Sequence, residues 1–389
     1  METPLYLDHA ATTPPLQVAL DAFSAAVETA YANPGSLHQA GATAARSVER
    51  SRRALQRAFG AAQYRVIWTA TGTESNHLGI QGMARAVRGR FPAVTPRILV
   101  GAIEHPSSSA AAKVLEKEGF RVETIPVDAR GIVTAAALGP MLAEDVAMIS
   151  LQWANNEIGS LNPIAELVSL VRNKAPKAIF HCDAIQAVGK CSTALDALGA
   201  DCFAVAAHKL GGLRGCAAFL LREGSPLPQP LFVGGGHEGG LRSGTENTMG
   251  IAAFAAAAKA RRELMLAEPQ FLHSRRQALL TGLREYFPDL TVLGPEQTAE
   301  QLGAVLAIAM PGIRAETFLH ILESNGVYVG SGSACNTHGH SESAVLAAIH
   351  LAPDLRNSVL RISFSGYETA ADVKKTIAAF VNSAAEFKG

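Results

Sequence analysis

From residue 66 onward, the sequence alternates between short apolar runs and stretches whose apolar residues recur at helical spacing. The runs have the length of buried strands, and the stretches between them have the length of helices. This alternation is typical of a mostly parallel sheet covered by helices. A chain of 389 residues is also long enough to form two domains. We therefore predict an α/β fold with a large, mostly parallel sheet.

The later part of the sequence indicates a second, smaller α/β domain. A long helical region over residues 248–287 is broken near Pro269, and strand-like and helix-like segments alternate again after it. We expect residues 1–15 to form an N-terminal segment that packs with the small domain. Residues 16–255 would then form the large domain, and residues 256–389 the small C-terminal domain.

The composition argues against several kinds of partner. Lys plus Arg and Asp plus Glu balance at 34 each, which argues against nucleic acid. No apolar run approaches the roughly 20 residues that span a bilayer, and the N-terminus lacks the pattern of a signal peptide. The five cysteines show no paired spacing. We therefore expect no membrane association, no disulfide framework, no metal site, and a reducing cytoplasm as the location.

Polar residues follow one apolar run after another: Thr73, His105, Asn156, Asp183, His208 and Lys209. Each of them alone is compatible with a helix cap or a solvated strand end. Because the carboxyl ends of parallel strands open onto one edge of a sheet, we expect these side chains to form a single site. Lys209 directly follows an apolar run, where loss of solvation lowers the pKa of an amine and suits it to Schiff-base chemistry.

The ordered set of motifs resembles the cysteine desulfurases, which are pyridoxal-phosphate enzymes of fold type I in the class-V aminotransferase group. The matching pieces are Tyr6-Leu7-Asp8 with residues 10–14, Asn33-Pro34 with Ser36 and His38, Thr73-Glu74-Ser75, Glu104-His105, residues 155–159, Asp183 with Gln186, His208-Lys209, Arg242 with Thr245, Ser333 with Cys335, and Arg361 with Ser363. They occur in the family's order and cover nearly the whole chain. The sequence around Cys335 resembles the branch that carries its cysteine on a longer loop.

The resemblance implies roles for the cofactor-binding residues. Lys209 would hold pyridoxal phosphate through a Schiff base and then move the substrate Cα proton. Asp183 would pair with the pyridine nitrogen, and His105 would stack on the ring and shuttle protons. An N-cap for Asp183 and an ordinary core histidine for His105 are the alternatives. The remaining contacts would come from Gln186 and Asn156 at the ring hydroxyl, from Gly72, Thr73 and His208 at the phosphate, and from Thr245 of the other subunit of a homodimer.

The resemblance also implies a substrate and a product. Asn33, Asn156 and Arg361 would bind L-cysteine, with Arg361 receiving the α-carboxylate in a bidentate manner. The Cys335 thiolate would attack the substrate sulfur and leave alanine and a protein persulfide. A sulfur-acceptor protein, either a scaffold or a sulfurtransferase, would then receive sulfur for iron–sulfur cluster or thio-cofactor assembly.

Some positions depart from the family. Ala206 stands where a phosphate-binding serine is usual, Thr71-Gly72 replaces Gly-Ala, and His77 replaces an asparagine. His338 and His340 follow the cysteine; they are compatible with assistance to the thiolate or with metal binding, and a solvated loop is the simpler interpretation. Two alternative functions stay open: a selenocysteine lyase or another C–S lyase on the same fold, and a non-catalytic sulfur-transfer partner.

Overall fold

The structure is a computed structural model, and it describes residues 4–268, 270–332 and 343–388. Its elements, in chain order, are β1 Leu5–Tyr6, α1 Gln17–Thr29, α2 Gln39–Phe59, β2 Tyr64–Thr69, α3 Gly72–His77, η1 Leu78–Gly82, α4 Met83–Val87, η2 Arg88–Arg90, β3 Arg97–Gly101, α5 Pro106–Glu116, β4 Arg121–Ile125, α6 Ala135–Leu138, η3 Gly139–Met141, β5 Val146–Gln152, α7 Ile164–Lys174, β6 Ile179–Asp183, α8 Leu195–Leu198, β7 Cys202–Ala206, η4 Ala207–Lys209, β8 Ala217–Arg222, η5 His237–Gly240, α9 Thr248–Ala267, α10 Phe271–Tyr286, β9 Thr291–Leu293, η6 Thr298–Glu300, β10 Val305–Ala309, α11 Ala315–Ser324, β11 Val327–Tyr328, β12 Gly330–Ser331, α12 Ala344–Ala348, α13 Pro353–Arg356, β13 Val359–Ser363 and α14 Ala370–Lys388.

Among the described residues, the large sheet has seven strands in the order β2-β8-β7-β6-β5-β3-β4. Strand β8 runs antiparallel to both of its neighbours, and the other pairings are parallel. Strands β2, β3, β5, β6 and β7 therefore all end at the same edge. The predicted α/β fold with a mostly parallel large sheet is confirmed.

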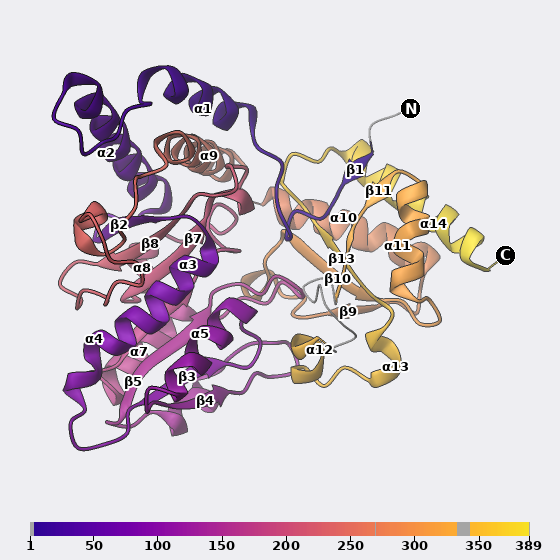
Figure 1. Cartoon of the computed structure of the whole chain (residues 1–389). Coiled ribbons are helices and arrows are strands. Elements are labelled where there is room, and N and C mark those ends of the chain that lie inside the picture. Colours follow the sequence, from indigo (N-terminus) through magenta and orange to yellow (C-terminus); the bar gives the residue numbers. More distant parts are fainter. Residues whose placement is uncertain (1–3, 269, 333–342, 389) are drawn as a thin grey trace.

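Helices cover both faces of this sheet, as Figure 1 shows for α3, α4 and α5 on one of them. In β2, Val66 and Trp68 join the larger apolar core, and Ile67 joins a second core on the opposite face. This alternation follows from the two-residue period of a strand. The sheet is thus buried on both sides, so polar groups at its edge become the natural place for a site.

The second part of the chain forms a smaller sheet in the order β12-β13-β10-β9, in which every pairing is antiparallel. The N-terminal segment lies beside it, because β1 pairs with β11 and Asp8 forms a bridge to Ser363 (Figure 1). The expected boundary between residues 255 and 256 falls within α9, a continuous helix that packs against α1 and α2. The proposed division into domains stays a prediction.

Within the described part of the chain, no helix combines the length and the apolar character that crossing a bilayer would require.

Candidate active site

A cavity of about 500 Å³ opens at the carboxyl edge of the large sheet. Its size falls in the usual range for small-molecule sites. The sequence-predicted residues that line it are Gly72, Thr73, His105, Asn156, Asp183, Gln186, His208, Lys209 and Arg361. These residues are scattered over nearly 300 positions of the sequence. Such wide spacing is expected, because each pair of parallel strands is joined by a long crossover connection. The expectation that the strand ends share one site agrees with this arrangement.

Lys209 reaches the N-terminal segment across the cavity. It ends the short helix η4, directly after β7, and is half-buried. Its Nζ donates hydrogen bonds to the backbone oxygen of Ala10 at 2.7 Å and to that of Ala11 at 2.8 Å. The amine is therefore held on one wall of the cavity by neutral acceptors.

Asp183 lies at the end of β6 and is buried. Its Oδ2 accepts a hydrogen bond from the Asn76 side chain at 2.8 Å, and its Oδ1 accepts one from the Ile185 backbone at 3.0 Å. Burial raises the pKa of Asp183, and these hydrogen bonds partly offset the rise. A buried carboxylate held in this orientation can form an ion pair with a cationic nitrogen of a ligand.

Asn76 connects Asp183 to His105. The same Nδ2 that donates to Asp183 also donates to Ser107 Oγ at 2.9 Å, and Ser107 Oγ lies 2.8 Å from His105 Nδ1. His105 Nδ1 additionally accepts a hydrogen bond from the Ser107 backbone. Because Nδ1 itself acts as the acceptor, the proton of the neutral imidazole is on Nε2. Burial lowers the pKa of His105, and Asp183 opposes this effect.

The first turn of α3 forms another wall of the cavity. Thr71 caps this helix by accepting a hydrogen bond from the Glu74 backbone, and Arg242 forms an ion pair with Glu74 at 2.7 Å. A Cβ on Gly72 would lie 2.5 Å from the tip of the Ile185 side chain, which would have to shift to admit a larger residue. The helix is thereby fixed with its N-terminal end at the cavity, an arrangement that favours an anion.

Arg361 is 2% exposed and enters the cavity from the small sheet. Its Nη2 donates to Asp8 Oδ1 at 2.8 Å, and its Nη1 donates to the backbone oxygen of Asn156 at 3.2 Å. Its Nε is buried and has no hydrogen-bond partner among the described residues. The guanidinium is therefore pre-oriented and keeps donor capacity for a ligand.

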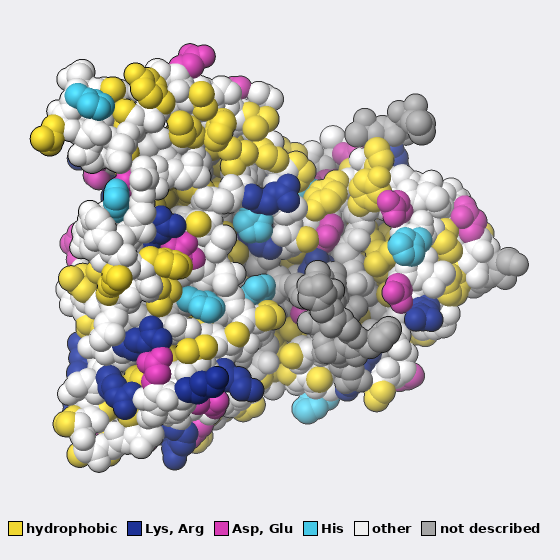
Figure 2. Space-filling view, viewed as in Figure 1, with side chains coloured by type: hydrophobic (Ala, Val, Ile, Leu, Met, Phe, Trp, Pro, Cys, Tyr) yellow, Lys and Arg dark blue, Asp and Glu magenta, His cyan; other side chains and the backbone are white. Residues whose placement is uncertain are grey.

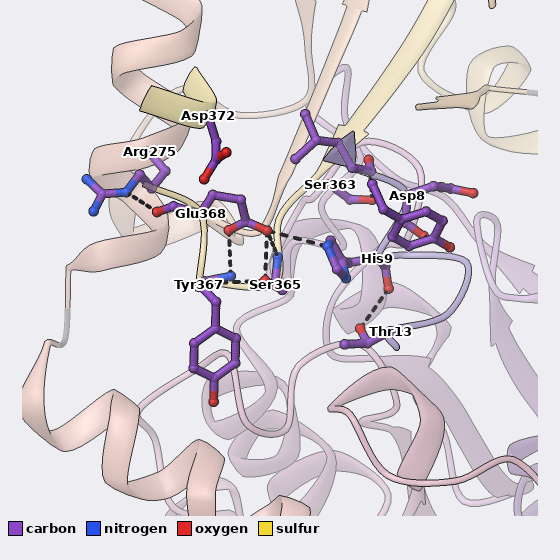
Figure 3. A network of polar contacts seen from close by, with 12 residues as sticks. Asp8, His9, Thr13, Arg275, Ser363, Ser365, Tyr367, Glu368 and Asp372 are labelled. Atoms are coloured by element: carbon purple, nitrogen blue, oxygen red, sulfur yellow. Dashed lines mark hydrogen bonds and ion pairs between the residues drawn. The ribbon is translucent and has the colours of Figure 1, made fainter. Parts of the chain in front are cut away.

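The N-terminal segment that supplies Asp8 is itself anchored, as Figure 3 shows. His9 Nε2 lies 3.4 Å from Glu368 Oε1, and the Glu368 carboxylate accepts hydrogen bonds from the backbones of Ser365 and Gly366. Burial lowers the pKa of His9 to about 4. These contacts hold the segment whose Ala10 carbonyl faces Lys209.

Two predicted residues do not line this cavity. Asn33 is exposed, and its side chain accepts a hydrogen bond from the Gly35 backbone. Thr245 is exposed on the segment that precedes α9. Cys335, together with His338 and His340, lies outside the described residues, so its predicted role is argued from the sequence alone.

The other cysteines are packed into the protein. Cys182, Cys202 and Cys216 are buried, and Cys191 is half-buried. Burial raises the pKa of the Cys191 and Cys216 thiols to about 12. Thiols of this kind are poor nucleophiles at neutral pH.

Sequence reasoning missed several residues of the site. Asn76, Ser107 and Arg214 belong to this group, as do the backbone oxygens of Ala10 and Ala11. Asn76 lies one helical turn after Thr73. This spacing would have predicted Asn76 as a site residue once the first turn of the helix was expected to bind a ligand. The backbone oxygens leave no signal in the sequence.

Ala206 lines the cavity next to Gly72. Replacing it with serine should strengthen the binding of pyridoxal phosphate by about tenfold or more, since a hydrogen bond to a charged group contributes roughly 1.5–3 kcal/mol. Equilibrium dialysis of the two proteins measures the dissociation constant. Ala154→Ser, elsewhere in the lining, is the matched control. An unchanged constant in Ala206→Ser would mean that another group, such as Thr71, already fills this role.

The comparisons with known proteins agree on one group. The sequence profile described as Aminotransferase class-V matches residues 5–376. The chain is 33% identical over 385 residues to the cysteine desulfurase IscS of Dictyoglomus turgidum, covering 97% of this chain and 93% of that protein. It is 34% identical over 376 residues to a cysteine desulfurase of Sinorhizobium fredii, covering 96% and 95% respectively. A solved NifS-like protein superposes with a TM-score of 0.89 at 28% identity, over 99% of this chain and 100% of the other.

The mostly parallel sheet, with a lysine, a carboxylate and an imidazole at its carboxyl edge, together with the likeness to the solved NifS-like protein, places the chain in the fold-type-I class of pyridoxal-phosphate proteins. The chain belongs to the class-V aminotransferase family and, within it, to the cysteine desulfurases. Members of this family depend on pyridoxal phosphate.

The cavity fits this cofactor. It brings together an amine for the aldehyde, a buried carboxylate for the ring nitrogen and a helix N-terminus for the phosphate.

Proposed function

We propose that the protein is a pyridoxal-phosphate-dependent L-cysteine desulfurase that converts L-cysteine to L-alanine and retains the sulfur as a persulfide on Cys335. The observation that supports this most directly is the placement of Lys209, Asp183 and His105 around one cavity. The names of the most similar relatives point the same way.

When bound, pyridoxal phosphate supplies an electron sink that stabilises negative charge at the substrate Cα. Asp183 would hold a proton at the ring nitrogen, and Asn76 would keep the carboxylate in place. Lys209 would anchor the cofactor and, once released, accept the Cα proton at Nζ. Because the Nδ1 atom of His105 accepts a hydrogen bond from Ser107, the proton of the neutral ring is on Nε2. His105 would donate this proton from Nε2.

Arg361 would bind the substrate carboxylate. Its guanidinium is buried between Asp8 and the Asn156 backbone, and its unpartnered Nε offers a donor. Asn156, which lines the cavity, remains a proposed substrate contact. Asn33 lies outside the cavity of its own chain, so the geometry does not support its proposed contact.

The sulfur step then forms an S–S bond and breaks the substrate C–S bond. The Cys335 thiolate attacks the substrate sulfur, and the carbon leaves with the bonding electron pair and is protonated to alanine. No external oxidant is needed, because the substrate carbon is reduced as it keeps the electron pair, and this balances the oxidation of the two sulfur atoms in the S–S bond. A sulfur-acceptor protein would subsequently take the sulfur for iron–sulfur cluster or thio-cofactor assembly.

We also propose a homodimer in the cytoplasm. Apolar side chains gather on the surface over α1 (Figure 2), and Val18, Val27 and Tyr31 are exposed there. An exposed apolar patch of this kind is typical of an interface. Thr245, exposed and outside the cavity of its own chain, would reach the phosphate of the partner subunit.

The test is a product assay on protein reconstituted with pyridoxal phosphate. L-cysteine and a reductant should give alanine and sulfide in equal amounts, and protein stripped of the cofactor should give neither. L-selenocysteine is assayed in parallel. Cofactor binding without alanine release from L-cysteine would contradict the proposal, and turnover of L-selenocysteine alone would favour the lyase alternative.

A further inference from the structure

Lys190 is a buried lysine behind the wall of the active-site cavity. It is 7% exposed and does not line that cavity, but it lines a separate one of about 350 Å³ with Trp153 and Cys191. Its Nζ donates a hydrogen bond to Gln186 Oε1 at 3.0 Å. Gln186 does line the active-site cavity, so it connects the two.

The contacts with Ala10 and Lys190 together fix which way the Gln186 amide faces. A lysine ammonium can only donate, and the Ala10 backbone oxygen, which lies 2.8 Å from Gln186 Nε2, can only accept. The carbonyl of the amide must therefore point to Lys190 and its NH₂ group toward Ala10. The same Ala10 oxygen accepts the hydrogen bond from Lys209, so the NH₂ group is held beside the reactive amine.

Among the described residues, no carboxylate balances the charge of Lys190. No Asp or Glu of the described residues forms an ion pair with it. The pKa of Lys190 is lowered to about 7, mainly by burial and in part by the positive charges of Lys209, Arg261 and Arg361, while Cys191 opposes them. With this pKa the amine is only partly protonated near neutral pH, and a negative group that arrives nearby with a ligand would favour its protonated form.

We propose that Lys190 is a positioning residue that orients the Gln186 amide with its NH₂ group toward the cofactor ring hydroxyl and supplies a buried positive charge that stabilises the ionised form of that hydroxyl. The inference rests on the proposed function, in which Gln186 contacts the ring hydroxyl. Lys190 touches neither cofactor nor substrate and acts through Gln186.

The test uses a ligand that does not depend on turnover. Deoxypyridoxine phosphate keeps the ring hydroxyl and phosphate but lacks the aldehyde, so it binds the apoprotein without reacting with Lys209. Lys190→Met removes the donor and the charge at similar size. We expect it to bind the analogue about tenfold more weakly. We also expect the ring hydroxyl of the bound analogue, followed by its ultraviolet absorbance, to ionise about one pH unit higher.

Two further variants separate this role from a merely structural one. Lys190→Arg keeps a cationic donor, and the adjacent cavity gives its larger head room, so it should restore both values. Lys174→Met, at an exposed lysine that donates to the Gly139 backbone, should change neither. If Lys190→Met does not fold, Lys190→Gln, which lacks the charge, is measured in its place.

The outcomes are distinct. Unchanged affinity and an unchanged absorbance midpoint in the variant lacking the charge would overturn the role of Lys190, as would a loss that Lys190→Arg does not restore. Failure of the wild-type apoprotein to bind the analogue would instead contradict the cofactor site, and with it the proposed function.

Discussion

Replacing Lys209 with alanine is expected to reduce alanine formation from L-cysteine by more than about 10⁴-fold, because it removes both the covalent anchor and the base. Nζ of Lys209 is the amine that the structure holds over the cavity, through the backbone oxygens of Ala10 and Ala11. The variant should still fold, since the Lys209 side chain is half-buried and the large apolar core does not include it.

Three measurements check this expectation. Alanine release reports the activity, and the visible absorbance band of the bound cofactor should disappear. The melting temperature of the apoprotein should stay close to that of the wild type. Lys174→Met is the control for loss of a lysine, and it should behave as the wild type in all three. Substantial alanine release from Lys209→Ala would exclude Lys209 as the base.

Replacing Cys335 with alanine is expected to abolish sulfide and alanine release from L-cysteine while leaving the cofactor absorbance intact. Without the Cys335 thiol, the substrate sulfur has no acceptor. The two variants therefore separate the two halves of the reaction, since Lys209→Ala loses the cofactor band and Cys335→Ala keeps it.

Cys191→Ala is the matched control for Cys335→Ala. Cys191 is half-buried, and burial raises the pKa of its thiol to about 12, so its removal should leave activity unchanged. Mass spectrometry after one turnover should find an added sulfur atom on Cys335. Persistent L-cysteine turnover by Cys335→Ala would argue for a C–S lyase that needs no enzyme persulfide.

The cavity is closed by contacts between residues that are distant in the sequence. Asp8 and Arg361 are separated by 353 positions in the chain, and their side chains are 2.8 Å apart. Ala10 is 199 positions from Lys209 and accepts its hydrogen bond. The N-terminal segment therefore forms a wall of the cavity, although it contributes almost nothing to the large sheet.

The sequence by itself was sufficient for the α/β class, for the polar residues at the strand ends and for the family. Strand and helix periods are local properties, and parallel strands bring their carboxyl ends together by topology alone. Only the tertiary structure decided what holds those residues: Asn76 on Asp183, Ser107 on His105, and Lys190 on Gln186. Such contacts depend on side-chain directions across elements that are remote in sequence, and a buried lysine or asparagine has the same local sequence signature whether it supports a site or only packs.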